Sequence, residues 1–246
     1  MWDNAAALNR TADLLLAAAG LIVLYCLIRF AIVQPVFAMR EIRVGGSVAH
    51  ITLEQVEAIA RRDIHGTFFT LDLARLRGSF EKMPWVRKVD IRRGWPDRIE
   101  VSIEEHQPLA RWGNTALVNS QGEVFEAAYD ATLPVFVGPA GTSREVAIQY
   151  EQWRGQFAEI GRIPVHVQLS PRRAWRVQLD DGMTLEIGRE MTESRLRRFL
   201  SVYPRTLAPL ARRIDYVDLR YANGFAARVP ELAKSEAARG AARPGA

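Results

Sequence analysis

The segment from Leu14 to Phe37 constrains this chain more than any other part of its sequence. It opens with LLLAAAGLIVLYCLI, fifteen residues without a charged side chain, and after Arg29 the apolar character resumes in FAIVQPVF. About 20 residues cross the hydrocarbon core of a bilayer as a helix. The segment therefore predicts a transmembrane anchor at residues 14–37, in which the long Arg29 side chain extends its charge toward one interface.

A cleaved signal peptide is the main alternative for this segment. No small-x-small cleavage site follows Ile28, and the apolar run continues beyond the length of an ordinary signal sequence. We therefore expect an uncleaved, single-pass anchor preceded by a short end at residues 1–13. Arginines flank the span on both sides, so the charge of the flanks does not settle its orientation.

Charge and cysteine content exclude several classes of protein. The formal net charge is +5, but lysine occurs only at Lys82, Lys88 and Lys234, and the arginines alternate with acidic residues. Without a basic block or a basic–aromatic stripe, we expect no nucleic-acid partner. Cys26, the sole cysteine, lies inside the apolar span. The rest of the chain therefore has no disulfide, thiolate metal site or cysteine nucleophile.

Residues 40–107 have the pattern of a small α+β domain. Ile42 and Val44 indicate a short strand, and Thr52 with Gln55 has the spacing of a capping box at the start of a helix. A second helix is predicted from Asp72 to Pro84. The segments WVRKVDI and RIEVSIEE follow as strands, and the second alternates strictly between apolar and polar residues.

Residues 108–230 predict a mainly antiparallel β domain with flanking helices. Hairpins are expected around Asn119–Gly122 and at Asp181-Gly182. One helix is predicted after Thr142, with a capping box to Glu145, and another begins near Thr192. The composition of residues 231–246 predicts a disordered tail. The fold class is therefore α+β, with one N-terminal transmembrane helix.

A search for catalytic chemistry finds no site. The four histidines are far apart in the sequence, and none has metal-ligand spacing. In EEHQ only Glu104 and His106 share a strand face, which is too few groups for a metal. No nucleophile elbow or phosphate loop occurs. The sequence therefore predicts no catalytic, cofactor or metal site, and a protein that is not an enzyme.

Several motifs together resemble the FtsQ (DivIB) family of bacterial cell-division proteins. The most specific are PWVRKVDIRRGWPDRIEVSIEEHQPLARW and VDLRYANGF, and the likeness covers about Leu14 to Pro230. It implies a short cytoplasmic end, an inner-membrane anchor, and a POTRA domain at residues 40–107 followed by a β domain, both periplasmic, at the division septum. It also implies a non-enzymatic scaffold that binds FtsB and FtsL, and recruitment by upstream proteins such as FtsK through the POTRA domain.

The end of the folded region suggests how such a partner binds. An Asn223-Gly224 turn would fold RIDYVDLRY back on FAARV and leave residues 225–229 as an uncovered edge strand. Exposed edges invite another chain to pair, so we expect a partner segment to add as a strand. Tyr221 and Phe225 are the aromatic anchor candidates, and Arg220 with Arg172 would meet acidic residues of the partner.

The resemblance independently places Tyr221, Asn223 and Gly224 in the partner-binding stretch. A simpler interpretation stays open, in which Tyr221 and Phe225 belong to the core and Asn-Gly is only a turn. Trp85 and Trp95 are expected to pack against the helices of the first domain. Two other functions also remain: a POTRA-type chaperone for envelope proteins, and a membrane-tethered wall hydrolase.

Overall fold

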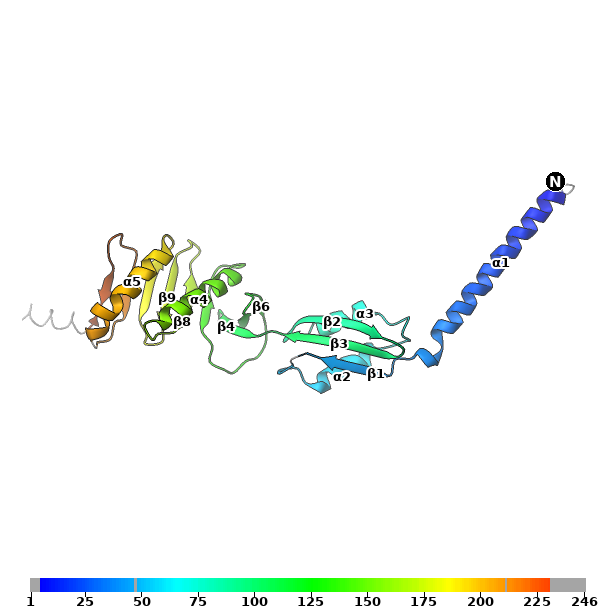
Figure 1. The fold of residues 1–246 in the computed structure, drawn as a ribbon, viewed down its shortest axis with the longest axis horizontal. Coiled ribbons are helices and arrows are strands. Elements are labelled where there is room, and N and C mark those ends of the chain that lie inside the picture. The colour runs from blue at the N-terminus through cyan, green and yellow to red at the C-terminus, as the bar shows by residue number, and fades with distance from the viewer. Residues whose placement is uncertain (1–4, 47, 211, 231–246) are drawn as a thin grey trace, which may run out of the picture. The chain divides into compact units, whose positions relative to one another are not determined.

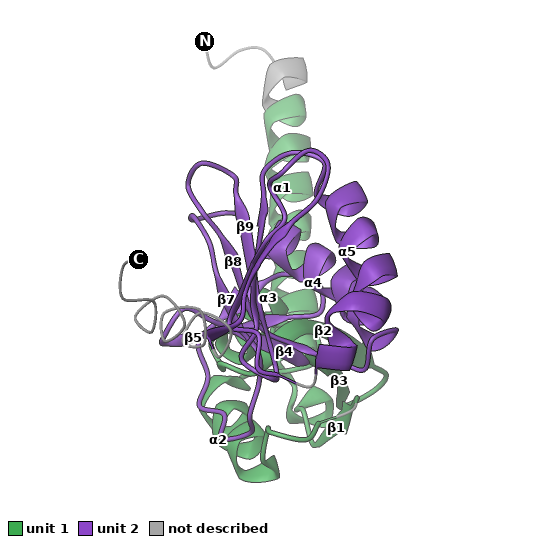
Figure 2. Cartoon of the chain, turned by 90° about the vertical axis from the view of Figure 1, so that its left-hand side faces the viewer, with its two compact units in different colours: residues 1–106 green, residues 107–246 purple. Residues whose placement is uncertain are grey.

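The chain divides into two compact units, residues 1–106 and residues 107–246 (Figure 2). The structure is a computed structural model, and it describes residues 5–46, 48–210 and 212–230. The predicted tail at 231–246 lies outside the described residues. Each unit has its own hydrophobic core.

The N-terminal segment forms one long helix, α1 (Ala5–Val33), followed by a single 3-10 turn, η1 (Pro35–Phe37) (Figure 1). The stretch Asn9–Val33 is long and apolar enough to cross a membrane, and none of it is buried within the protein. Within the described part of the chain its apolar side chains are exposed, which is the arrangement expected of a helix surrounded by lipid.

The remainder of the first unit is a three-stranded sheet with two helices. Strand β3 (Arg98–Glu105) lies in the middle, parallel to β1 (Glu41–Gly45) and antiparallel to β2 (Val86–Gly94). Both helices begin as predicted: α2 (Leu53–Asp63) has the Thr52–Gln55 capping box, and Asp72 caps α3 (Leu73–Phe80). Leu76 and Phe80 of α3 and Ile99 of β3 are almost fully buried in the core.

The second unit contains nine described strands and two long helices. The helices are α4 (Ser143–Ala158) and α5 (Thr192–Thr206), and a 3-10 turn, η2 (Ala208–Leu210), follows α5. The strands are β4 (Pro108–Trp112), β5 (Ala116–Asn119), β6 (Val124–Phe125), β7 (Val135–Val137), β8 (Pro164–Leu169), β9 (Trp175–Leu179), β10 (Thr184–Gly188), β11 (Tyr216–Asp218) and β12 (Ala226–Arg228).

These strands form one sheet in the order β12-β11-β10-β9-β8-β7-β4-β5-β6. Five of the eight pairings are antiparallel, while β10–β11, β7–β8 and β4–β7 are parallel. Helices α4 and α5 lie together on one face of the sheet (Figure 2). The core between the helices and the sheet includes Trp153, Phe157 and Phe199 from the helices and Val177 and Leu185 from the strands. The α+β class predicted from the sequence is confirmed.

Three local predictions are wrong. The Thr142–Glu145 capping box does not form, because the Thr142 hydroxyl donates to the Pro139 carbonyl at 2.7 Å and Thr142 makes no side-chain cap. Trp95 is 64% exposed instead of packing against the helices, whereas Trp85 is half-buried against the first core.

The third error concerns the last hairpin. Strands β11 and β12 are joined by the seven residues from Leu219 to Phe225, not by a two-residue Asn-Gly turn. Neither Asn223 nor Gly224 has the positive φ that such a turn requires. The longer loop makes β12 begin at Ala226, so the regular edge strand has three residues instead of the five expected.

Candidate partner-binding site

Among the described residues β12 is the last strand of the sheet and pairs with β11 alone, and its three side chains are exposed. Leu219 N–H donates to the Glu186 carbonyl at 2.9 Å, so the backbone of Leu219 faces β10. Because backbone groups alternate along a strand, Asp218 faces β12, where it pairs with Ala226. The N–H and C=O of the next residue, Ala227, therefore point away from β11 toward the open edge.

Helix α5 holds the loop between β11 and β12. The Arg195 guanidinium donates to the carbonyls of Ile187 at 2.9 Å and Arg220 at 3.3 Å. One turn further, Arg198 donates to the carbonyls of Ala222 and Tyr221. These bonds fix the backbone of the loop, while the Tyr221 side chain remains 58% exposed. The loop thus presents an aromatic ring on a backbone that two arginines of α5 hold.

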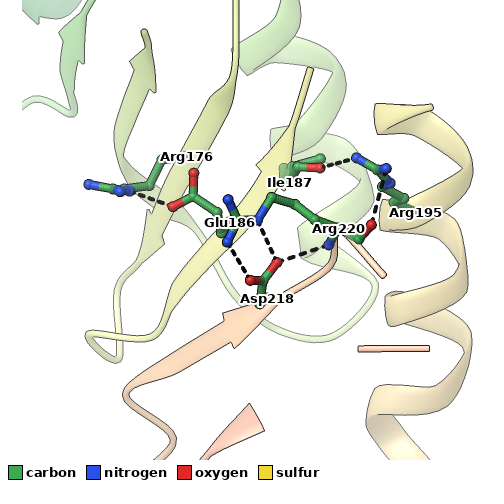
Figure 3. A network of polar contacts seen from close by, with 6 residues as sticks. All are labelled: Arg176, Glu186, Ile187, Arg195, Asp218 and Arg220. Atoms are coloured by element: carbon green, nitrogen blue, oxygen red, sulfur yellow. Dashed lines mark hydrogen bonds and ion pairs between the residues drawn. The ribbon is translucent and has the colours of Figure 1, made fainter. Parts of the chain in front are cut away.

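Two carboxylates lie side by side on the sheet face opposite the helices. Glu186 of β10 and Asp218 of β11 are in register, and each is neutralised by an arginine (Figure 3). Arg176 Nε donates to Glu186 at 2.8 Å, and Arg220 contacts both Asp218 oxygens at 2.9 and 2.7 Å. The bonds from Arg220 lower the pKa of Asp218, against the opposing effect of burial. Asp218 thereby fixes the direction of the Arg220 side chain.

Beside Arg220 the surface has an open hollow of about 400 Å³. Gly188, at the bulged end of β10, has a φ of +85°, and a Cβ there would lie 2.8 Å from Arg195 Nη1 and 3.1 Å from Arg220 Cγ. Glycine therefore relieves backbone strain and leaves room for both arginines. The residues that line the hollow are mostly cationic: Arg172, Ala174, Gly188, Arg189, Glu190, Arg195 and Arg220.

The structure brings together part of the predicted site. Arg172 and Arg220, which are far apart in the sequence, line the same hollow. Tyr221 and Asn223 are exposed, and Gly224 is half-buried with nothing near the position of a Cβ. Phe225 differs from the expectation of a free anchor, because its ring packs on Phe199 at 5.7 Å between centroids. Their binding role stays a prediction.

The arginines of α5 were not predicted from the sequence as part of the site. Arg195 and Arg198 are three residues apart, beside the buried Phe199, so they lie along one face of the helix. That spacing was the available signal. What it did not reveal is which backbone segment would lie opposite, since the loop at 219–225 approaches α5 only in the folded chain.

The structure gives no sign of a metal centre in its described part. No three His, Cys, Asp or Glu side chains gather there in a way that would hold an ion. The fold and the site instead define a class: a protein with an N-terminal helix able to span a membrane, a small α+β unit, and a β unit that ends in an open edge beside cationic side chains.

The comparisons with known proteins identify the family. The profile "POTRA domain, FtsQ-type" matches residues 37–106, and "Cell division protein FtsQ/DivIB, C-terminal" matches residues 110–220. The chain belongs to the FtsQ/DivIB family of cell division proteins. The second profile ends at Arg220, so the residues that line the hollow lie within it, whereas Tyr221 and β12 lie beyond it.

Whole-length relatives agree. The chain is 43% identical to a "Cell division protein FtsQ" of Nitrosospira multiformis over 233 residues, which cover 93% of this chain and 99% of the relative. It is 42% identical to the protein of that name from Burkholderia pseudomallei, covering 93% and 94%. The Neisseria gonorrhoeae protein is 34% identical, covering 93% and 95%.

Proposed function

We propose that this protein is a non-enzymatic scaffold of the division machinery in the bacterial inner membrane. In this proposal residues 1–13 are cytoplasmic, residues 14–37 form the anchor, and the POTRA domain (40–107) and β domain (108–230) lie in the periplasm at the septum. The β domain binds FtsB, together with FtsL, through its C-terminal edge. The observation that carries the proposal is the open β12 edge next to the cationic hollow.

Backbone pairing alone does not account for binding at this edge. Three residues give an edge of about 10 Å, and two or three hydrogen bonds contribute roughly 1 kcal/mol each. Association costs about 4–15 kcal/mol. Side chains must therefore supply most of the affinity.

The exposed Tyr221 ring is the best-placed anchor, because α5 already fixes its backbone and little ordering entropy is lost on binding. Arg172 and Arg220 line the hollow, and because Asp218 already offsets the charge of Arg220, Arg172 is the main attraction for acidic residues on the partner strand or just beyond it. Phe225 contributes indirectly, because its ring packs on Phe199 and so holds the loop against α5.

Binding of full-length protein in detergent to a peptide from the membrane-distal end of FtsB tests the proposal. We expect Tyr221→Ala to weaken binding about 10- to 30-fold, since a central aromatic anchor contributes about 1.5–2 kcal/mol or more. Arg172→Glu should weaken it further by opposing the acidic partner residues. The measurement is fluorescence anisotropy of a labelled peptide.

The matched controls are Val124→Ala, an exposed apolar residue on β6 at the opposite end of the sheet, and Arg197→Glu on α5. Both controls should bind as the wild type does. Equal affinity of Tyr221→Ala, Arg172→Glu and wild type would refute the proposed binding edge.

Recruitment by an upstream protein such as FtsK belongs to the same proposal and is assigned to the first unit. Its support is the three-stranded sheet, whose outer strands β1 and β2 each pair with β3 alone among the described strands. Replacing residues 40–106 with an unrelated domain should abolish septal localisation in cells while FtsB binding persists. Normal localisation of that chimera would refute it.

A further inference from the structure

Four aromatic rings gather where α1 meets the rest of the first unit. We call Phe37, Phe68, Phe69 and Trp95 the junction cluster. The rings of Phe37 and Phe69 lie 5.3 Å apart between centroids, Phe68 and Trp95 5.4 Å, and Phe37 and Trp95 6.0 Å. All three contacts are tilted or edge-on, as aromatic pairs prefer. The rings come from η1, the loop before α3 and the β2–β3 turn.

The junction cluster is not an ordinary core. Trp95 is 64% exposed and Phe69 47%, and the adjoining Val36 is 66% exposed. The core of the first unit is a separate group of residues built around Leu76, Phe80 and Ile99. A contiguous apolar surface of this kind on one end of a domain indicates contact with something apolar.

The position of the cluster along the chain identifies that contact. Thr67 Oγ1 donates to the Ile32 carbonyl at 2.9 Å, and Phe68 N–H donates to the Phe37 carbonyl at 2.8 Å. These bonds tie the loop that carries Phe68 and Phe69 to the last turn of α1 and to η1. The cluster and the end of the apolar helix are therefore one structure.

The length of α1 determines how deep in the bilayer the junction cluster lies. The residues from Leu14 to Val33 rise about 30 Å at 1.5 Å per residue, which equals the thickness of the hydrocarbon core. Phe37 follows Val33 by about one helical turn, and the polar interfacial layer on each side of the core is about 5–8 Å deep. Tryptophan and other aromatic rings concentrate in that layer.

From this we infer that the junction cluster is a membrane-interface contact that seats the near end of the first unit in the headgroup layer of the bilayer crossed by α1. The inference rests on the proposed membrane anchor. The contact has a mechanical consequence. The bilayer then holds both α1 and the rings, and together they restrict how far residues 39–106 tilt relative to α1. A free partner protein is the weaker interpretation, because the rings continue directly from the apolar helix.

Quenching of tryptophan fluorescence by lipid bromine atoms tests the inference. The full chain, carrying Trp2→Phe to remove the tryptophan nearest the N-terminus in the sequence, is placed in vesicles of phosphatidylcholine brominated near the carbonyl end of its acyl chains. We expect quenching that is mostly lost with Trp95→Phe and retained with Trp85→Phe, since Trp85 is half-buried and stacks on His50.

A tryptophan introduced elsewhere in the junction cluster shows whether the Trp95→Phe protein is still folded. Phe69→Trp in the Trp95→Phe protein should restore the quenching, because position 69 lies in the same cluster. If the chain floats with the vesicles but the Trp2→Phe protein shows no quenching, the inference is overturned. Quenching that Trp95→Phe leaves unchanged overturns it as well. A chain that alkaline carbonate washes off the vesicles overturns the membrane anchor, and the interface contact with it.

Discussion

Glu105 is the residue on which the first unit most visibly depends. Its side chain is only 6% exposed and accepts N–H bonds from Ala49, His50 and Ile51 at 2.9–3.1 Å. The three donors lie just before the Thr52 cap of α2. Burial raises the pKa of Glu105, but the backbone donors and His50 outweigh it and the pKa is lowered.

We expect Glu105→Gln to reduce the stability of the first unit by about 1–3 kcal/mol, because an amide oxygen accepts these bonds more weakly than a carboxylate. A lowered pKa in the folded state stabilises above the ordinary value of 4.5, and the effect is lost as the pH falls through the folded value. The difference between variant and wild type should therefore shrink in acid. Denaturant unfolding at several pH values measures it.

Glu104→Gln is the matched control. The Glu104 carboxylate is next to Glu105 in the sequence, is 54% exposed and pairs only with Arg87 among the ion pairs described. It should change stability by less than about 1 kcal/mol. Equal losses for both variants, or a Glu105→Gln effect independent of pH, would show that the bonds to residues 49–51 are not the cause.

At the scale of single residues, the sequence predicted only some of the residues that matter. Arg172, Arg220 and Tyr221 were singled out, and the structure places two of them on one hollow and exposes the third. Glu105 was passed over, because Glu104 and His106 share the other strand face. Nothing local in EEHQ indicates that a loop some fifty residues earlier would return to it.

At the scale of elements, β12 has the feature most open to test. Ala227 directs its N–H toward the open edge, whereas Ala226 pairs with Asp218 of β11. Ala227→Pro should therefore leave folding nearly unchanged and weaken FtsB-peptide binding about fivefold, the loss of one hydrogen bond worth about 1 kcal/mol. Calorimetric titration of the full-length protein checks the affinity.

Ala226→Pro is the companion variant. Its N–H faces β11, so proline there should also destabilise the β11–β12 pair in thermal unfolding. If Ala227→Pro binds the peptide with wild-type affinity while folded, strand addition at this edge is wrong, even if Tyr221 contributes to binding.

Helix starts show which element-level predictions succeed. Thr52 and Asp72 cap their helices as expected, because each cap uses donors within three residues. Thr142 has the same spacing but bonds backward to Pro139. The competing acceptor comes from the turn after β7, whose shape depends on the sheet, and so the local pattern misleads.

At the scale of the whole molecule, the two units have separate cores. Leu76 is fully buried in the first and Leu185 in the second. Leu76→Ala should cost about 2–5 kcal/mol and raise hydrogen exchange throughout α2, α3 and β1–β3, while the second unit keeps wild-type protection. Mass spectrometry of the exchanged full-length chain provides the comparison.

Leu185→Ala is the reciprocal control and should raise exchange in the second unit alone. A rise in both units from either variant would mean that the two cores unfold as one.

The sequence by itself determined an N-terminal helix apolar enough to span a membrane, most of the strands and helices along the chain although not β4, the α+β class and the family. These depend on periodicity, composition and local motifs, which act over a few residues and survive any arrangement of the rest. Tertiary structure alone decided that α5 holds the 219–225 loop, that Arg172 and Arg220 share a hollow, and that Trp95 joins Phe37 outside the core. The reason is that these contacts join residues far apart in the chain, whose meeting depends on strand order and loop length and not on local preference.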